Sequence, residues 1–526
     1  MTLSQALIRA LHTADCFDHP VKDIEVHETH ISWIVLTGDY AYKIKKPLDF
    51  GSFLDFSTLE RRKHLCEQEV RLNRRLAPTL YLDTVPISGT PEAPRINDES
   101  AVFEYAVKMR QFSNRHLFSA LQASGELSLE LLDDLVDQLV AFHEQAERIQ
   151  GDSDLGSPQM VSRTIDNEFT LIRPRLEEEA ALIKRLALLQ EWTEETFQRL
   201  QPEFERRWQE GFVRETHGDI HLGNAVRHEG RALLFDGIEF NEELRWNDVG
   251  CDLAFLVMDL EARDEPAFAH HALNRYLELS GDYSLVRLLP YYKIYRALIR
   301  AKVAMIRYHQ PELSDADRLD VMAEYERYIE LAERYSEIRF PYMIIGVGVS
   351  GSGKSRFTEE MVRELGGVRI RSDVERKRLY GFAADADTGS GLNGGIYTPQ
   401  ATHATYERLS NLSATLLESG IPVCIDATCL KKSQRDRLRH EAEARGLPVL
   451  MISFEADEET LRRRIVKRSQ RSGEASEAGL EVLDKQLANR EPFAPEEHGQ
   501  LIHIDTTAPN ANVTLARLIR EQLRLH

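Results

Sequence analysis

Two patterns of apolar and polar positions divide the chain. In the first part, short alternating runs such as Ile31–Leu36 come before long stretches in which apolar residues recur every three or four positions, as at Leu132, Leu135 and Leu139. Alternation is typical of strands, and the longer period is typical of helices. The pattern therefore predicts a small β lobe followed by a larger helical lobe. The expected elements are strands at 31–36, 40–45 and 101–109 and helices at 58–77, 127–147 and 285–336.

Beyond residue 341 the pattern changes to an alternation of strands and helices. Such an order is typical of a doubly wound parallel sheet. The sequence thus predicts an α+β bilobal domain at 1–336, a linker at 337–341 and an α/β domain at 342–526, with a flexible insertion at 383–395. The strands of the second domain are expected at 343–348, 368–371, 421–425, 448–453 and 501–504.

Bulk composition excludes several classes of protein. The chain has 526 residues, which is too long for one core. Its net charge of −20 argues against general binding to nucleic acid or anionic membranes, although a local basic groove is still allowed. The five cysteines are scattered, which favours reduced thiols. No apolar run reaches the length of a signal-peptide core or a membrane span, so a cytoplasmic protein is expected.

A phosphate-binding loop follows the apolar run Met343–Val347. Residues 348–355 match G-x-x-x-x-G-K-[ST], and a helix-like stretch follows. In such a loop backbone N–H groups surround phosphate, the lysine reaches the β- and γ-phosphates, and the last hydroxyl holds Mg²⁺. The alternative is a glycine-rich turn. The residues expected to bind the nucleotide are Gly348, Ser350, Gly351, Ser352, Gly353, Lys354 and Ser355, with Ser355 also a metal ligand.

A second group of polar residues lies far upstream. Residues 217–224 read His-Gly-Asp-Ile-His-Leu-Gly-Asn, which fits the kinase catalytic-loop spacing H-x-D-x-x-x-x-N. Twelve residues after Asn224, an apolar run ends in Asp236. Asp219 is the candidate base for an attacking hydroxyl, and Asn224 and Asp236 are candidate Mg²⁺ ligands. The alternatives are a polar turn between strands and metal binding by His217 and His221.

These motifs resemble the aminoglycoside/choline-type phosphotransferases over residues 25–310. The resemblance implies that Lys43 grips the α- and β-phosphates, that Glu69 is its ion-pair partner and that Asp252 braces the catalytic loop. Lys45 and Glu67 are close alternatives to these two residues. A further alternative is that the charged side chains of this strand and helix are only solvated and bind no phosphate. Two departures stand out. No G-x-G-x-x-G precedes Lys43, and only fifteen residues separate Asp236 from Asp252. The short segment favours a small-molecule acceptor over a protein.

Residues 343–505 resemble P-loop kinases of the gluconate-kinase, polynucleotide-kinase and zeta-toxin type. The resemblance implies that Asp373, at the end of a strand, is the general base of the acceptor and that Arg376 holds an anionic group of the acceptor. Asp373 can also be a helix N-cap. Asp426, which ends the strand at 421–425, is the candidate Walker-B-like carboxylate for Mg²⁺.

A basic stretch at 462–471 packs six cations into ten residues without an acid. The related kinases close a lid over the transferring phosphate, so Arg464 and Arg468, four residues apart on one helix face, are the candidate catalytic arginines. Residues 473–479 would form its hinge. A solvated helix and a groove for a phosphorylated polymer end are the alternatives.

The whole arrangement resembles bacterial proteins described as bifunctional aminoglycoside phosphotransferase/ATP-binding proteins. The sequence predicts ATP- and Mg²⁺-dependent phosphoryl transfer to small hydroxyl-bearing acceptors at two separate sites. One alternative is a nucleotide-sensing regulatory protein with an inactive module. Another is 5′-end polynucleotide kinase activity in the second domain. The sequence indicates no acceptor and no oligomeric state.

Overall fold

The structure, a computed structural model, forms two compact units that are each described separately. The first is Met1–Asp259 with Tyr295–Ile329, and the second is Leu260–Ile294 with Glu330–His526. The residues that the structure describes are 3–51, 54–149, 153–177, 179–311, 313–384, 386, 388, 395–468 and 479–524.

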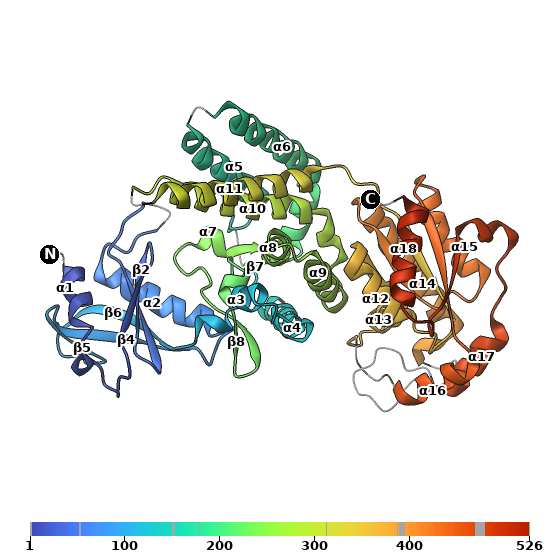
Figure 1. Cartoon of the computed structure of the whole chain (residues 1–526), viewed down its shortest axis with the longest axis horizontal. Helices are drawn as coiled ribbons and strands as arrows, with labels where there is room; N and C mark the ends of the chain where they lie inside the picture. Colours follow the sequence, from blue (N-terminus) through green and yellow to red (C-terminus); the bar gives the residue numbers. More distant parts are fainter. Residues whose placement is uncertain are drawn as a thin grey trace. The chain divides into compact units, whose positions relative to one another are not determined.

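The first unit begins with a six-stranded antiparallel sheet in the order β1-β2-β3-β6-β4-β5. Helix α2, which Thr58 caps at its N-terminus, packs on this sheet and buries Cys66 and Val70 against Val107 of β6 (Figure 1). The elements are β1 (Glu25–Glu28), β2 (Ser32–Leu36), β3 (Tyr40–Lys45), α2 (Leu59–Asn73), β4 (Tyr81–Thr90), β5 (Ala93–Ile96) and β6 (Val102–Arg110).

Two small β-pairs and many helices follow this sheet. Strand β7 pairs with β10, and β8 pairs with β9 in a hairpin. The loop from β7 to β8 carries the motif at 217–224. Three helices, α8, α10 and α11, have residues in both units. The bounds are α1 (Leu3–Ala10), α3 (Phe118–Ala123), α4 (Leu129–Gln145), α5 (Pro158–Ile172), α6 (Ala180–Gln209), β7 (Val213–Glu215), β8 (Ala225–His228), β9 (Arg231–Leu234), α7 (Glu242–Arg245), β10 (Trp246–Asp248), α8 (Val249–Ala262), α10 (Leu289–Tyr308) and α11 (Asp315–Ser336).

The second unit contains a parallel five-stranded sheet in the order β12-β13-β11-β14-β15. Its middle strand β11 is buried along its full length, as expected for a strand covered on both faces. The bounds are α9 (Pro266–Ser280), β11 (Met343–Val347), α12 (Lys354–Leu365), β12 (Val368–Arg371), α13 (Ser372–Leu379), α14 (Pro399–Glu418), β13 (Val423–Asp426), α15 (Lys432–Glu443), β14 (Val449–Glu455), α16 (Glu458–Arg468), α17 (Leu480–Asn489), β15 (Leu501–Asp505) and α18 (Ala511–Leu523).

Helix α9 belongs to this second unit although it precedes β11 by more than sixty residues (343 − 280 = 63). It packs against α12 (Figure 1) and against the edge strand β12. Asn274 accepts a hydrogen bond from the Arg369 N–H at 2.7 Å and donates one to the Gly367 carbonyl at 2.9 Å. Exposed edge strands invite pairing with other chains, and α9 covers this one.

The predicted fold class is confirmed: an α+β kinase-like domain precedes a parallel-sheet P-loop domain. All five strands predicted beyond residue 341 are found within two residues of their expected positions. Strand β9 corresponds to the apolar run predicted to end in Asp236, whereas β4, β5, β7, β8 and β10 had no counterpart in the prediction. The domain boundary at 337–341 stays a prediction, and the predicted insertion and hinge lie largely outside the described residues.

Candidate functional site

The catalytic-loop motif folds as a turn around Asp219. Asn224 donates from its amide nitrogen to the Asp219 carboxylate at 2.9 Å and to the Asp219 carbonyl at 3.0 Å. His221 Nε2 lies 3.5 Å from the same carboxylate. Burial opposes ionisation, but the neighbouring His221 holds the pKa of Asp219 at about 2. Asp219 is therefore an ionised acceptor at neutral pH, with a third of its side chain exposed (34%).

The buried carboxylate of Asp252, on α8, binds the backbone of this loop. Asp252 accepts from the backbone N–H groups of His217 and Gly218, both at 3.0 Å, and it also contacts His143 Nε2 at 3.3 Å. Gly218 has φ +84°, and a Cβ there would lie 2.8 Å from the Leu244 carbonyl oxygen. The loop therefore needs glycine at this position.

Arg296 on α10 is a loop contact that the sequence did not predict. Its guanidinium donates to the Gly218 carbonyl at 2.8 Å and to the Cys251 carbonyl at 3.3 Å, and its side chain is buried. It also lies 3.9 Å from Asp252. Nothing in the local sequence separates Arg296 from Arg300 one turn later, so only the fold reveals this contact.

Lys43, Glu69 and Asp236 meet from three separate elements. Lys43 Nζ on β3 lies 2.8 Å from Glu69 Oε1 on α2 and 2.5 Å from Asp236 Oδ1 after β9. Glu69 is fully buried, whereas 44% of the Asp236 side chain is exposed. Burial disfavours the ammonium, but Asp236 and Glu69 raise the pKa of Lys43 well above its ordinary value. The cation predicted to hold phosphate is thus paired with the carboxylate predicted to hold metal.

Lys45 is a second partner of the same glutamate. Because side chains two residues apart on a strand share a face, Lys45 lies beside Lys43 and contacts Glu69 Oε2 at 2.6 Å. Lys45 also pairs with Glu239, three residues after Asp236. The sequence posed Lys43 and Lys45 as alternatives, and the structure brings both to Glu69. Glu67, the alternative to Glu69, is half exposed and lies 3.9 Å from Lys63.

The backbone at Asp236 has an uncommon conformation. Its φ is +60°, in the left-handed region that residues with a Cβ seldom adopt. Its N–H donates to the Tyr81 hydroxyl at 3.0 Å, and the next N–H, of Gly237, donates to Asn73 Oδ1 at 2.8 Å. Buried contacts therefore hold the turn that directs this carboxylate toward Lys43. Such maintained strain is typical of functional sites.

The two histidines of the motif orient backbone. His217 Nε2 contacts the Phe235 carbonyl at 3.0 Å, and His221 Nδ1 accepts from the Gly223 N–H at 3.0 Å. Burial lowers the pKa of His217, so its neutral form is favoured. Throughout the described ranges, no cluster of three or more His, Cys, Asp or Glu side chains has metal-binding geometry. Metal binding by these two histidines therefore gains no support.

Short turns precede Lys43 where related kinases have a glycine-rich loop. The turn between β2 and β3 spans residues 37–39, and Gln111 Oε1 accepts from the N–H groups of Thr37 and Gly38 at 3.0 and 2.8 Å. In the turn between β1 and β2, Thr29 and Ser32 bond to each other. Backbone donors at both turns thus have partners within the protein.

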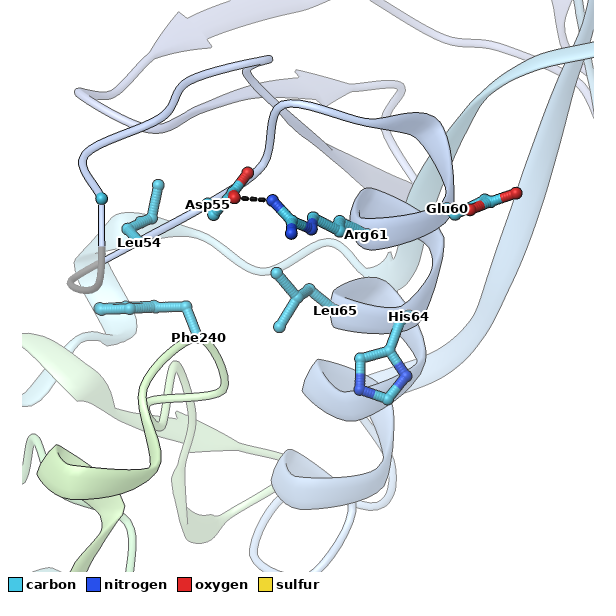
Figure 2. Close-up of a pocket in the computed structure, with 8 residues that line it drawn as sticks. Leu54, Asp55, Glu60, Arg61, His64, Leu65 and Phe240 are labelled. Atoms are coloured by element: carbon cyan, nitrogen blue, oxygen red, sulfur yellow. Dashed lines mark ion pairs between the residues drawn. The ribbon is translucent and has the colours of Figure 1, made fainter.

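A pocket of about 440 Å³ is lined by residues of α2 and of the segments around Leu54 and Phe240. Leu54, Leu65 and Phe240 supply its apolar wall, and Arg61 reaches across to Asp55 (Figure 2). Phe240 directly follows Glu239, which connects the pocket wall to the charged site. The sequence gave no signal for this pocket because its walls come from three separate segments.

The second site forms around the phosphate-binding loop between β11 and α12. Gly351 has φ +80°, and a Cβ there would lie 2.8 Å from the Leu461 carbonyl oxygen. Gly353 has φ +97° at the N-cap of α12. Since both positions need glycine, the motif and the backbone agree. The remaining loop residues Gly348, Ser350 and Ser352 lie between these elements, and Ser355 is exposed at the start of α12.

Lys354 and Asp426 are the buried charges of this site. Lys354 Nζ donates to the Val349 carbonyl at 3.2 Å. Burial lowers the pKa of Lys354, although Asp426 and Asp373 act in the opposite direction. Asp426 ends β13 with 5% of its side chain exposed, and its Oδ2 is a buried atom without a hydrogen-bond partner among the described residues. A bare buried carboxylate oxygen suits a hard cation or its water shell.

The two predicted acceptor-binding residues lie on α13 and differ in their surroundings. Asp373, at the first turn, is partly exposed and acts electrostatically on Lys354. Arg376 is buried: it donates to the Ile396 carbonyl at 3.1 Å and to Thr402 Oγ1 at 3.2 Å. These contacts tie α13 to residues 395–402, and Arg376 Nε is a buried atom without a hydrogen-bond partner among the described residues.

The predicted lid arginines also differ. Arg464 donates to the Gly351 and Ser352 carbonyls at 3.2 and 3.3 Å and to Thr506 Oγ1 at 2.9 Å. These contacts hold the loop backbone, and the contact of Arg464 with a transferring phosphate stays a prediction. Arg468, one turn later, acts electrostatically on Lys354. Gln486 of α17 accepts from the Ser350 N–H at 2.7 Å, a contact that the sequence did not predict.

No helix within the described ranges is long and apolar enough to span a bilayer.

Comparison with known proteins matches each unit's motifs to a family. Residues 53–289 match the model of the phosphotransferase enzyme family, and residues 343–493 match a model described as an AAA domain. Proteins named "Uncharacterized protein Rv2004c" of Mycobacterium tuberculosis (strain ATCC 25618 / H37Rv) and "Uncharacterized protein Mb2027c" of Mycobacterium bovis are each 28% identical over 94% of this chain and 95% of theirs.

Solved structures match over about a third of the chain. A gluconokinase from Sinorhizobium meliloti 1021 is 24% identical and covers 35% of this chain and 98% of its own, with a TM-score of 0.25. A sugar kinase from Janibacter sp. HTCC2649 is 22% identical over 35% of this chain and 95% of its own, with a TM-score of 0.26. The two family matches give one result: a region that matches the phosphotransferase enzyme family is followed along the chain by a region that matches a P-loop kinase domain.

Proposed function

We propose that the protein transfers the γ-phosphoryl group of ATP to small hydroxyl-bearing acceptors at two separate Mg²⁺-dependent sites. Kinase-type domains support phosphoryl transfer in general. The observation that carries the finer proposal is the pair Lys354 and Asp426: a buried cation that terminates a phosphate-binding loop beside a buried carboxylate oxygen with no hydrogen-bond partner. Mg²⁺ would supply charge neutralisation on the phosphates, and Asp426 and Ser355 would hold it.

In the second unit, loop N–H groups and Lys354 would hold the β- and γ-phosphates. Asp373 would accept the proton of the attacking hydroxyl, whose oxygen forms the new bond to phosphorus as the bond to the ADP oxygen breaks. Its electrostatic effect on Lys354 supports a location near the transferring group. Arg376 is buried and bonded to Ile396 and Thr402, so we assign it the shaping of the acceptor side and not direct charge pairing. Arg468 remains the proposed catalytic arginine.

In the first unit, Lys43 would hold phosphate, with Glu69 as its anchor. Asn224 and Asp236 would hold Mg²⁺, and Asp219 would orient the acceptor hydroxyl and take its proton. Since the pKa of Asp219 is about 2, Asp219 is ionised at neutral pH and can accept that proton. The ion pair between Lys43 and Asp236 must open when phosphate and metal arrive.

Small molecules suit the first site better than proteins do. The segment between Asp236 and Asp252 is occupied by α7 and β10, and β10 pairs with β7. A segment of fifteen residues, most of them in α7, β10 and the start of α8, has no length for a protein-docking loop.

A nucleotide-sensing function is the second candidate. Two internal contacts favour it. Asp236 forms an ion pair with Lys43, and Gln486 accepts a hydrogen bond from the Ser350 N–H. Nucleotide binding would exchange both contacts and so change the conformation of the loops that carry them.

A screen of ADP formation separates the two candidates. The full-length protein would be incubated with Mg²⁺, ATP and a library of small hydroxyl compounds, and each hit repeated with Lys354→Ala and Asp219→Asn. Turnover that falls selectively in one variant supports catalysis at that site. Nucleotide binding without acceptor-dependent ADP formation in any well would refute the catalytic proposal and favour sensing.

A further inference from the structure

Helix α9 presents a carboxylate to two arginines of the P-loop unit. Glu278 Oε1 lies 2.7 Å from Arg371, and Glu278 Oε2 lies 3.3 Å from Arg369. All three side chains are largely buried, with exposures of 16%, 19% and 9%. Burial opposes the charge, but Arg371 and Arg369 keep the pKa of Glu278 below its ordinary value. Glu278 is therefore an anion at neutral pH.

Sheet register brings Arg371 to a second, more distant partner. In the parallel pair β12–β13, Arg371 is aligned with Asp426 and Arg369 with Cys424. Arg371 Nε lies 3.8 Å from Asp426 Oδ2, which is too long for a hydrogen bond. The same oxygen is the buried one without a hydrogen-bond partner. The sheet thus places Arg371 beside Asp426, the proposed metal ligand. The Arg371 guanidinium makes its shorter contact with Glu278 and not with Asp426.

We propose that Glu278 is a positioning residue of the P-loop site, which holds Arg371 away from Asp426 and so leaves Asp426 Oδ2 available to Mg²⁺. This inference rests on the proposed function of that site. Without the Glu278 charge, the Arg371 guanidinium would close the short remaining gap and form a charge-assisted hydrogen bond with Asp426. A carboxylate that is bonded to arginine competes poorly for a cation.

The inference extends the functional P-loop unit upstream of its motifs. Glu278 lies inside the range 53–289 that matches the phosphotransferase family, but its segment, Leu260–Ile294, belongs to the second unit. A fragment that starts at residue 337 or 342 lacks this carboxylate and also the Asn274 contacts that cover β12.

The test measures Mg²⁺-dependent binding of a fluorescent ADP analogue to the full-length protein in a Lys43→Met background, which removes the proposed nucleotide contact of the first site. Glu278→Gln is expected to raise the Mg²⁺ concentration for half-maximal binding about tenfold. Glu359→Gln is the matched control, because Glu359 also pairs with Arg369, at 3.5 Å, but does not contact Arg371. It is expected to leave the Mg²⁺ requirement unchanged.

Rescue by a second substitution makes the test specific. Glu278→Gln/Arg371→Gln is expected to return the Mg²⁺ requirement to within about twofold of the parent, because the competing guanidinium is gone. Arg371→Gln alone is expected to need no more Mg²⁺ than the parent, and this variant decides the matter if Glu278→Gln does not fold. The proposal would be overturned if Arg371→Gln raised the Mg²⁺ requirement or if the double variant did not return it toward that of the parent. It would also be overturned if Glu278→Gln and Glu359→Gln raised the Mg²⁺ requirement equally. Nucleotide binding that persists in Lys354→Ala would instead refute the proposed function of the site.

Discussion

The two candidate sites differ in whether their lysine is paired with their candidate metal ligand. In the first unit, Lys43 is paired with both Glu69 and Asp236, at 2.8 and 2.5 Å. In the P-loop unit, Lys354 bonds only to a carbonyl among the contacts of the described residues, and Asp426 Oδ2 has no hydrogen bond there. The first site pairs its lysine directly with its candidate metal ligand, whereas at the second site Asp426 Oδ2 has only the longer contact with Arg371, at 3.8 Å.

This difference predicts different responses to nucleotide. At the first site, phosphate and metal must replace an existing ion pair, so part of their binding energy goes into separating Lys43 from Asp236. At the second site, the loop is already shaped and a buried, desolvated ammonium gains more from phosphate than an exposed one does. We therefore expect the P-loop site to bind nucleotide more tightly.

The largest effect is expected for Lys354→Ala. Removal of the ammonium from a buried phosphate site should lower acceptor-dependent ADP formation at the second site by roughly 10³-fold, because no other group there replaces its charge. The measurement is the initial rate with an acceptor from the screen. Lys432→Ala, which alters an exposed lysine paired with Asp436, is the control. Near-full turnover in Lys354→Ala would show that the loop does not serve catalysis.

The next effect is expected for Asp219→Asn. The amide cannot take the hydroxyl proton, so phosphoryl transfer at the first site should fall by roughly 10²-fold, while transfer at the second site stays within about twofold. Both rates are measured in the same full-length variant. Loss of both activities in a folded protein would mean that the two motifs serve one composite site.

Lys45 and Lys43 share Glu69 but should differ when removed. Lys45→Met removes a cation from two buried carboxylates, Glu69 and Glu239, whose side chains are 0% and 4% exposed. The free energy of unfolding should therefore fall by about 3 kcal/mol. Lys43→Met leaves Asp236, which is 44% exposed and can be hydrated, so the loss of stability should be smaller and the loss of nucleotide affinity larger. Thermal unfolding and nucleotide titration of both variants test this. Equal losses of stability would contradict the assigned roles.

The smallest effect concerns pH. Burial lowers the pKa of Lys354, so the free site loses its ammonium at lower pH than an exposed lysine would. Nucleotide affinity at the second site should therefore decline several-fold between about pH 7 and about pH 10. In Lys354→Arg the affinity, although weaker, should stay flat because a guanidinium remains protonated. A flat profile with lysine would mean that its pKa is not lowered.

Local patterns made much of this molecule predictable from sequence. The buried run Met343–Val347 and the glycines after it specify a strand and a phosphate-binding loop without help from distant residues. The spacing within 217–224 likewise specifies a polar loop. Lys43 and Glu69 are 26 positions apart, and only the family resemblance suggested that they meet.

Contacts made by residues of common types could not be predicted. Arg296 and Glu278 lie on ordinary amphipathic helices, and their roles come from the packing of distant segments. Arg464 and Arg468 share one helix face, yet the former bonds to loop carbonyls while the latter acts on Lys354. A charge pattern predicts a basic helix, but the direction of each side chain depends on neighbours that the pattern does not include.

The central claim, two separate phosphotransferase sites, is tested most directly by counting nucleotides. Calorimetric titration of the full-length protein with a non-hydrolysable ATP analogue and Mg²⁺ should give two binding events, the tighter one lost in Lys354→Ala and the weaker one lost in Lys43→Met. The double variant should bind none. A single event that either substitution abolishes in a folded protein would contradict the account.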